Sequence, residues 1–427
     1  MQKSNRKKNY RVSTLLRAEQ WNKIQDKRNL PRCFNTSLHK LVFFITAVGI
    51  LFSSPLCFAQ NTTASTGYRD GFYLKTDDDK FLLKFGSRLN ALYSYGVLDQ
   101  EADISSFDLK HGKVYFGGHA FSKSIQFYVQ SSFAQNSRSN AFGLMSENNV
   151  FTLEDYYVRG NYGDISLQMG QFKVPFSKQY MIYTGNLQFV TRSIASNAFQ
   201  FGRDRGVTLA GKKPWLSYML GLYNGASQMT VPSITQLTNS INMSNDTIDT
   251  GMTYLARLSL FPRRPAGFSE GDTAFNEASR LELGISLALD QGRDYDTNND
   301  TLTDDTGVNT FSLASDFTFL HRGFSLQGEF YYRNHHFESL PNASSYGFYG
   351  QAGYFIVPRS LEIAGRYSWL EPNTDTFNDR ASEISGVVSY LMSKNHKHKM
   401  QWQYSRIHQD VFDKTDHWFH WMLQLTI

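Results

Sequence analysis

The sequence predicts an all-β chain that closes into a transmembrane antiparallel β-barrel of about 16 strands, with one loop folded inward. Past Gln60, apolar and polar residues alternate and no helical period persists. The alternating segments run ~9–11 residues, the length that crosses a bilayer when a strand is tilted. The chain also ends inside such a segment, HWFHWMLQLTI, as ring closure requires if the last strand pairs with the first.

Residues 1–59 have the pattern of a leader with a secretory signal peptide. Lys40 precedes an apolar core at about 41–51, and the small residues Cys57 and Ala59 predict cleavage after Ala59. The core is too short for a spanning helix, which needs ~20 apolar residues. We therefore expect an exported chain with a short N-terminal segment at 60–80 and the barrel at 81–427.

Charge and cysteine content change when that leader is set aside. It holds eleven Lys/Arg and two Asp/Glu, so the rest of the chain has 32 basic and 36 acidic residues, although the whole sequence has a net charge of +5. Nucleic-acid binding needs a basic face, so we expect no nucleic-acid partner. Both cysteines, Cys33 and Cys57, lie in the leader. A barrel closed by its own backbone hydrogen bonds is stable without disulfides.

Individual segments show the two faces of a barrel wall. Leu83, Phe85 and Leu89 share one face of their segment, and Lys84 and Arg88 share the other. The same alternation, interrupted by turn residues, predicts strands at 81–96, 107–121, 125–135, 151–162, 165–173, 205–211, 217–224, 252–261, 280–290, 309–320, 323–335, 346–357, 360–370, 381–392, 398–408 and 417–427.

A soluble β-sandwich with one wet face would show the same alternation. Aromatic residues near the segment ends favour the barrel, because they are enriched at both membrane interfaces. Linker lengths also alternate: short ones such as 163–164 and 321–322 are typical of periplasmic turns, and long polar ones such as 227–251 and 290–308 are typical of exterior loops.

The stretch GQFKVPFSK at 170–178 interrupts this regular plan. Pro175 ends its strand because proline has no N–H for the ladder, and the next strand opens only with RDRG at 203–206. We expect residues 174–205 to fold into the barrel as a constriction loop. Rings of Lys and Arg select anions in pores, and the candidates on or beside this loop are Lys173, Lys178, Arg192, Arg203 and Arg205. Inward-facing wall candidates are Lys84, Arg88, Lys113, Arg159 and Arg366.

The same stretch carries a family resemblance. GQFKVPFSKQ, the run from 189 to 211 that includes NAFQFGRDRG, and LGLYNGA at 220–226 resemble the phosphate-selective porin O and P family, as do YLARLSLFP and LQGEFYY. The resemblance covers roughly 80–427. It implies a trimeric, sixteen-stranded channel in a Gram-negative outer membrane, whose third exterior loop enters the barrel and whose basic side chains pass small anions, phosphate or polyphosphate among them. The last residue departs from the aromatic that assembly signals of such barrels usually carry: it is Ile427.

Alternative interpretations of these residues remain open. A basic side chain in the lumen can be the partner of a lumen carboxylate, and Glu154, Asp155, Asp204 and Glu329 are available. The cations can also only focus the field of a general or differently selective porin on the same scaffold. A barrel that serves as an adhesin or a hydrolase is a more distant alternative.

Other constellations give weaker signals. DYDTNNDTLTDD at 294–305 has the oxygen spacing of a calcium loop, but Asn299 stands where the glycine belongs, so we expect a solvated loop. The sequence has no G-x-S-x-G and no H-E-x-x-H motif, so we expect no enzyme, no resident metal and no cofactor. Expected partners are outer-membrane lipid and lipopolysaccharide, small anions, a homotrimer of the chain, and the barrel-assembly machinery acting on the C-terminal strand.

Overall fold

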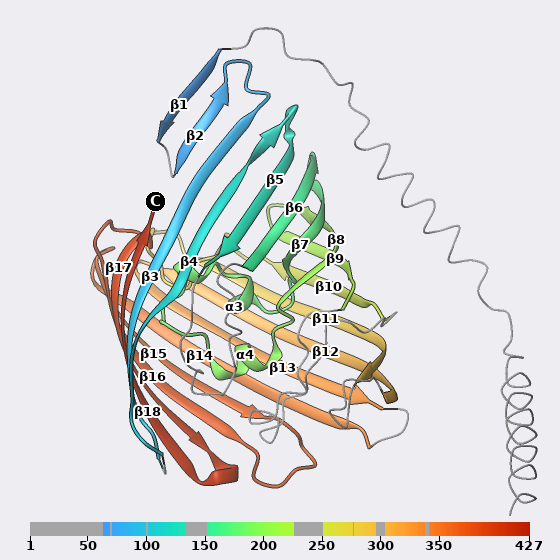
Figure 1. Ribbon diagram of the computed structural model, residues 1–427, viewed down its shortest axis with the longest axis vertical. Helices are drawn as coiled ribbons and strands as arrows, with labels where there is room; N and C mark the ends of the chain where they lie inside the picture. The colour runs from blue at the N-terminus through green and yellow to red at the C-terminus, as the bar shows by residue number, and fades with distance from the viewer. Residues whose placement is uncertain are drawn as a thin grey trace, which may run out of the picture. The chain divides into compact units, whose positions relative to one another are not determined.

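Sixteen antiparallel strands form a closed ring in the computed structural model of the protein (Figure 1). The structure describes residues 63–68, 71–99, 101–133, 152–225, 251–275, 277–295, 304–337 and 341–427, with the backbone alone at 292–295 and 304–308. The predicted leader at 1–59 and most of the calcium-loop candidate at 294–305 lie outside these residues. No described helix is long and apolar enough to span a membrane.

All sixteen predicted strands are present, with ends that differ by a few residues. The ring consists of β3 (Leu82–Val97), β4 (Ile104–Ala120), β5 (Ser122–Ser132), β6 (Thr152–Tyr162), β7 (Ile165–Lys173), β8 (Arg203–Lys212), β9 (Leu216–Tyr223), β10 (Thr253–Leu260), β11 (Arg280–Tyr295), β12 (Asp304–His321), β13 (Phe324–His336), β14 (Ala343–Val357), β15 (Leu361–Glu371), β16 (Ala381–Leu391), β17 (His398–Gln409) and β18 (Lys414–Thr426). Each strand pairs with the next, and β18 pairs with β3 from His417↔Val97 to Thr426↔Arg88.

The two faces of the wall carry opposite chemistry. In β16, Glu383, Ser385 and Ser389 are buried, whereas Ile384 and Val388 between them are exposed. An apolar outer face around a polar interior is the pattern of a transmembrane barrel, because lipid solvates the outside and water or protein fills the inside. The last strand follows the same rule, since its exposed residues are Phe419, Trp421, Leu423 and Leu425. The predicted alternation is therefore confirmed.

Tight turns connect consecutive strands at one end of the barrel. Arg322 and Gly323 join β12 to β13 with φ values of 46° and 83°, and Gly163 turns between β6 and β7 with φ of 57°. Positive φ at both central residues suits the twist of a two-residue hairpin. Apart from the connection between β10 and β11, residues 261–279, the longer connections leave the strands at the opposite end. That difference marks the turn end as periplasmic and the long-connection end as exterior.

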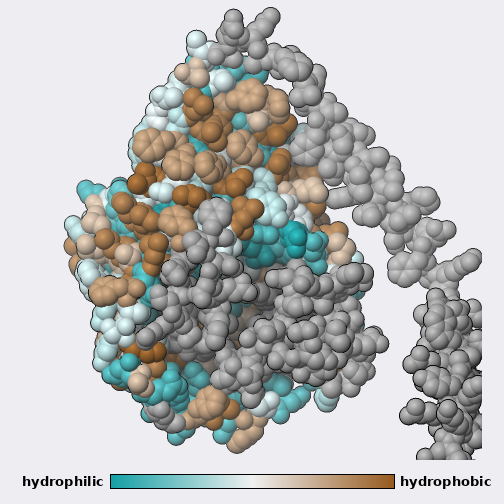
Figure 2. Space-filling model, viewed as in Figure 1, coloured by the Kyte–Doolittle hydropathy of each residue, from teal (hydrophilic) through white to brown (hydrophobic). Residues whose placement is uncertain are grey.

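A hairpin at the periplasmic end was missing from our prediction for residues 60–80. Strand β1 (Ala64–Tyr68) pairs with β2 (Phe72–Thr76), and β2 pairs with β3 from Phe72↔Phe85 to Lys75↔Leu82. Strand β2 thus takes the place of β18 as the partner of β3 beyond the backbone hydrogen bonds between Ile427 and Ser87. Five-residue strands are too short for a clear alternating signal, which explains the omission. Figure 2 shows hydrophobic side chains gathered over the upper part of the view, where β1–β5 lie.

The connection between β7 and β8 turns into the barrel (Figure 1). We call residues 174–202 the inner loop; it contains α3 (Lys178–Met181), η1 (Thr184–Asn186) and α4 (Ile194–Phe199). The predicted loop ran to Arg205. In the structure Lys173 pairs with Arg203 and Gln171 with Arg205, so strand pairing already holds residues 203–205 in β8.

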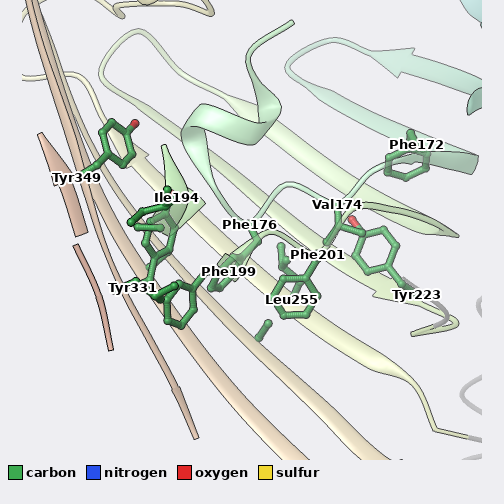
Figure 3. Packing of buried hydrophobic residues seen from close by; sticks show 14 of the residues in the cluster. Phe172, Val174, Phe176, Ile194, Phe199, Phe201, Tyr223, Leu255, Tyr331 and Tyr349 are labelled. Carbon is green, nitrogen blue, oxygen red and sulfur yellow. The ribbon is translucent and has the colours of Figure 1, made fainter. Parts of the chain in front are cut away.

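A buried hydrophobic cluster joins the inner loop to the wall (Figure 3). Phe176 and Phe199 of the loop are fully buried, and the Phe199 ring stacks on Tyr331 with 5.2 Å between ring centroids. The wall offers Ala288 and Ala314 at this place, small side chains that leave room for the rings. Burial of each large apolar side chain contributes roughly 1.5–3 kcal/mol, so this cluster holds the loop inside the barrel.

Candidate functional site

The inner loop starts where the β7 ladder can no longer continue. Val174 still donates its N–H to the Gly202 carbonyl, at 3.0 Å, and Pro175 then has no N–H to donate. Ser177 caps the short helix α3, because its side chain accepts from the Tyr180 N–H. The loop therefore leaves the wall at a fixed point and in a fixed direction.

Acidic and amide side chains of one half of the wall hold the N–H groups of the loop. We call the inner faces of β10–β17 the tether wall. Glu329 accepts the N–H of Lys178, at 3.0 Å, and that of Gln179. Glu383 accepts the N–H of Ile194, also at 3.0 Å. These charged acceptors replace the water that an ordinary loop would use, so the loop backbone is satisfied inside the barrel.

Basic side chains of the same tether wall hold the loop carbonyls. Lys399 donates to the Leu187 carbonyl at 2.6 Å, and Arg333 donates to the Phe199 carbonyl at 2.8 Å. Arg366 donates to the Thr191 carbonyl at 2.8 Å. Both signs of charge on the tether wall are therefore used to anchor backbone.

One predicted constriction residue and one predicted wall residue belong to this anchoring system. Lys178 forms an ion pair with Glu282, at 2.6 Å, with both side chains almost fully buried. Arg366 pairs with Glu383 on the neighbouring strand. Since their charges are matched by buried carboxylates, we leave both residues out of the candidate anion site. The carboxylate-partner interpretation that the sequence left open fits them better.

A second segment packs against the loop from the periplasmic side. The connection between β10 and β11 places Glu270 against the inner loop, where it accepts from the Gln188 N–H at 2.6 Å and from the Gln179 side chain at 2.8 Å. Phe268 lies over the Lys178 ammonium group, 4.5 Å from nitrogen to ring centroid. The sequence did not predict this contact, because the only feature it showed between these two predicted strands was the length of their connection.

The opposite half of the wall borders open space. We call the inner faces of β3–β9 the cavity wall. Between it and the inner loop lie a cavity of about 350 Å³ and another of about 280 Å³, and Thr184 lines both. The larger one is lined mostly from β4–β9 and the smaller one from β3, β4 and β16–β18. Among the described residues, both cavities thus lie between the inner loop and the wall, and the smaller one extends to β16 and β17 of the tether wall.

Basic residues surround the larger cavity. Its lining includes four of the predicted residues, Lys113, Arg159, Lys173 and Arg203, and one carboxylate, Asp155.

Each of the four cations is held in place by a defined contact, and Arg159 donates to the Gln168 side chain at 2.9 Å. Lys113 donates to Glu154 at 2.7 Å, and Arg203 bonds to Asp155 at 3.0 Å. Lys173 donates to the carbonyls of Tyr180 and Ile182, which leaves its charge without a matching carboxylate among those contacts. The cavity therefore has an excess of positive charge.

The smaller cavity adds two further cations and two carboxylates, Asp108 and Glu383. Arg192 of the inner loop lines it and donates to the Ile182 carbonyl at 3.2 Å. Burial lowers the pKa of Arg192 below its ordinary value, although a guanidinium stays charged at neutral pH. Lys110 also lines this cavity and donates to the Val190 carbonyl at 2.6 Å. A β-bulge between Asn90 and Ala91 shifts the register of β4 beside Lys110, and this hid Lys110 from the alternation argument.

The remaining predicted residues lie elsewhere. The Arg88 guanidinium stacks 3.6 Å from the Tyr183 ring centroid and donates to Thr184, so it fixes the tip of the loop. Lys84 lies on β3 opposite Tyr73 of the added hairpin. Arg205 is exposed on β8 and does not line either cavity. The described residues contain no group of three His, Cys, Asp or Glu side chains that could hold a metal.

A closed sixteen-stranded ring, apolar outside and polar inside, with a loop folded across its interior, is the architecture of an outer-membrane porin. The family model of the phosphate-selective porin O and P matches residues 85–417. The chain therefore belongs to this family, and its place is the outer membrane of a Gram-negative bacterium. No curated protein sequence matches the chain.

Solved structures confirm the fold at low sequence identity. The anion-selective porin from Comamonas acidovorans is 8% identical, with a TM-score of 0.56 over 81% of this chain and 99% of that chain. A loop-deletion form of OmpT from Vibrio cholerae is 8% identical, with a TM-score of 0.54 over 81% of this chain and 100% of that one. The DcaP channel of Acinetobacter baumannii is 10% identical, with a TM-score of 0.52 over 84% and 99%.

Proposed function

We propose that the protein lets small anions diffuse passively across the outer membrane along the cavity wall, phosphate and polyphosphate among them. One observation carries the proposal: four cations and one carboxylate line the larger cavity. A permeating anion passes Lys113, Lys173 and Arg203 there, and Lys110 and Arg192 beside the smaller cavity. Arg205, Lys178 and Arg366 have no part in this path.

The electrostatics of the path support a preference for anions. At 4 Å in water a unit charge attracts an anion by about 1 kcal/mol, and a narrow protein-walled passage strengthens that attraction. The Lys173 ammonium group lines this cavity and donates to the carbonyl oxygens of Tyr180 and Ile182, which are neutral acceptors. A passage with a surplus of such charges concentrates anions and repels cations. The proposal needs no catalytic residue and no cofactor.

We also propose a homotrimer as the working assembly. One solved neighbour, the trimer form of OmpT from Vibrio cholerae, matches over 81% of this chain and 100% of that chain, with 9% identity and a TM-score of 0.52. Lipid and lipopolysaccharide are the expected partners of the apolar outer face. The alternating end of β18 is the expected signal for the assembly machinery. Detergent-resistant trimers on unheated gels would support the assembly, and a monomer in mild detergent would contradict it.

A general porin on the same scaffold is the second candidate. The acid partners of Lys113 and Arg203 favour it, because Glu154 and Asp155 offset part of the positive charge. In that case the path would be weakly selective or unselective.

Reversal potentials in planar bilayers distinguish these candidates. Under a tenfold KCl gradient, we expect the wild type to prefer chloride. The variant Lys173→Gln should lower that preference several-fold, since it removes about 1 kcal/mol of attraction at close range. Arg205→Gln is the matched control and should leave the preference unchanged. A cation-preferring wild type would overturn the proposal, and an effect of Arg205→Gln as large as that of Lys173→Gln would show that the path is misplaced.

A further inference from the structure

A row of aromatic side chains runs round the inner surface of the cavity wall. Tyr115 of β4 stacks near Tyr128 of β5, with 6.2 Å between centroids, and Tyr128 stacks on Tyr157 of β6 at 5.6 Å. Tyr157 meets Phe172 of β7 edge-on at 5.9 Å, and Phe172 meets Tyr223 of β9 at the same distance. Five rings from five strands thus form a continuous apolar surface, which we call the ring row.

The two ends of the ring row differ in their surroundings. Phe172 and Tyr223 are buried in the cluster that joins the inner loop to the wall, so packing accounts for them (Figure 3). Tyr128 and Tyr157 are half-buried and line the larger cavity, and Tyr157 also packs against the edge of that cluster. A barrel interior filled with water has no physical reason to present ring faces to that water. These two rings are therefore available to a ligand.

Further apolar groups enclose the same space. Met181 of the inner loop, Met219 of β9 and Phe268 of the β10–β11 connection line the larger cavity together with Tyr128 and Tyr157. Methionine side chains adapt to flat apolar surfaces and make favourable contacts with aromatic rings. Aromatic and sulfur-containing side chains thus lie on several sides of the cavity.

The cations lie at the rim of this apolar surface. The Arg159 guanidinium is 5.4 Å from the centroid of the Tyr157 ring. Lys173 and Arg203 line the same cavity. A ligand that meets both kinds of surface needs a flat apolar body and a negative group at one edge.

We propose that the larger cavity is a binding site for organic anions with a planar apolar body, aromatic carboxylates being the simplest example. The carboxylate is held by Lys173 and Arg203, and the ring lies against Tyr128 and Tyr157. This inference rests on the proposed anion path and names the class of anion that the path binds best. A volume of about 350 Å³ accommodates one such molecule.

Inorganic phosphate fits the same site less well. Phosphate oxygens can accept more hydrogen bonds than a carboxylate can, whereas Lys113 and part of the Arg203 guanidinium already bond to Glu154 and Asp155. Phosphate would also leave the faces of Tyr128 and Tyr157 in contact with water. An aromatic monocarboxylate needs fewer donors and covers the rings, so the same cavity favours it.

The test measures how well added anions block the chloride current of the full-length porin in planar bilayers. Benzoate, acetate, phosphate and a neutral sugar, glucose, are compared at equal ionic strength. We expect benzoate to reach half-block at a concentration about tenfold lower than acetate or phosphate, the factor that about 1.4 kcal/mol gives. Glucose should not block.

Substitutions of the two rings identify the origin of that difference. The double variant Tyr128→Ser with Tyr157→Ser should bring the benzoate and acetate half-block concentrations to within about twofold. The matched double variant with Phe at both positions keeps the rings and should retain the tenfold difference. The reversal potential in KCl, measured for both variants, reports whether the cations of the path are still in place.

The outcomes separate this inference from the proposed anion path. If the wild type prefers chloride but benzoate, acetate and phosphate block equally, or phosphate blocks best, the inference fails and the anion path stands. Block by glucose as strong as that by benzoate would also overturn it, since the rings would then serve neutral sugars. A cation-preferring wild type would overturn both.

Discussion

The tether wall and the cavity wall belong to one ring of strands, yet their polar side chains have different uses. On the tether wall, buried charges of both signs meet loop backbone or each other, as with Glu329 at the Lys178 N–H and Lys178 at Glu282. On the cavity wall, Lys113 and Arg203 line the larger cavity, and Lys173 lines it while it also donates to two loop carbonyls. The difference follows from the position of the inner loop, which packs its hydrophobic cluster against the tether wall and borders the two cavities on its other side.

This contrast shows that the role of a charged residue in a barrel cannot be inferred only from the fact that it faces inward. Lys178 and Lys173 lie five residues apart in one connected stretch, but one is matched by a carboxylate and the other by neutral carbonyls. A buried, paired charge mainly specifies position. A cation held by neutral acceptors contributes a field to the passage.

The largest effect is expected when Glu329, the tether-wall acceptor of two loop N–H groups, is removed. In Glu329→Ala, two loop N–H groups and the hydroxyls of Tyr331 and Tyr349 lose their acceptor. Since each buried unpaired donor costs about 1–3 kcal/mol, we expect loop docking to weaken by about 3–5 kcal/mol. Single-channel recording should then show a larger conductance and a smaller anion preference.

The control for that variant is Asp416→Ala, which removes a buried carboxylate whose contacts are Asp99 and Lys414 at the exterior end. It should leave the conductance at the wild-type value. A Glu329→Ala channel with wild-type conductance would mean that the acid side chains do not hold the loop.

A second experiment exchanges the ion pair on the tether wall for neutral residues. Lys178→Met alone leaves Glu282 buried without its partner, and we expect a cost of about 3–5 kcal/mol in unfolding free energy. Lys178→Met combined with Glu282→Gln should recover most of that loss. Urea unfolding in lipid vesicles measures both. The double variant should also keep the chloride preference, and a loss of preference would show that Lys178 faces the path after all.

The smallest expected effect is a pH dependence at the exterior end. Burial and the neighbouring Glu371 raise the pKa of Asp379 to about 7, from an ordinary value of 3.8. The folded chain thus holds this proton more tightly than the unfolded chain, so stability falls as pH rises from about 4 to about 7. We expect a decrease of about 1 kcal/mol or less, since the site lies at the mouth, near water.

Comparison of unfolding midpoints at pH 5 and pH 8 tests that dependence. Asp379→Asn removes the titrating group, so the difference between the two midpoints should shrink. Asp375→Asn, in the same exterior connection, is the control. Identical pH dependence in the wild type and Asp379→Asn would exclude this role for the carboxyl.

Much of the wall could be predicted from sequence because period-two alternation is a local property. All sixteen ring strands follow from it, and the departure of the chain at Pro175 follows from the missing N–H of proline. The β1–β2 hairpin did not, since five residues give too few alternations to distinguish a strand from a polar linker. The loop end also differed, because pairing of Arg203 with Lys173 is decided between two strands.

The candidate site could be predicted only as a set of basic residues near one loop. The acidic partners that decide which cation is paired are distant in sequence. Glu282 lies 104 residues after Lys178, and Glu154 lies 41 residues after Lys113. Pattern alone does not reveal such pairings. Lys110 was missed because a bulge shifts its register, and the ring row was missed because its five rings come from five strands.

The measurement that most directly tests the central claim is the accessibility of single cysteines to a small anionic thiol reagent. Ser166 of β7 lines the larger cavity, and Ser286 of β11 lies under the loop, where it donates to the Phe176 carbonyl. The two variants are Ser166→Cys and Ser286→Cys. We predict rapid labelling with loss of current at position 166, and labelling at least about tenfold slower at position 286. Equal rates at both positions would show a lumen open all round and would contradict the division into tether wall and cavity wall.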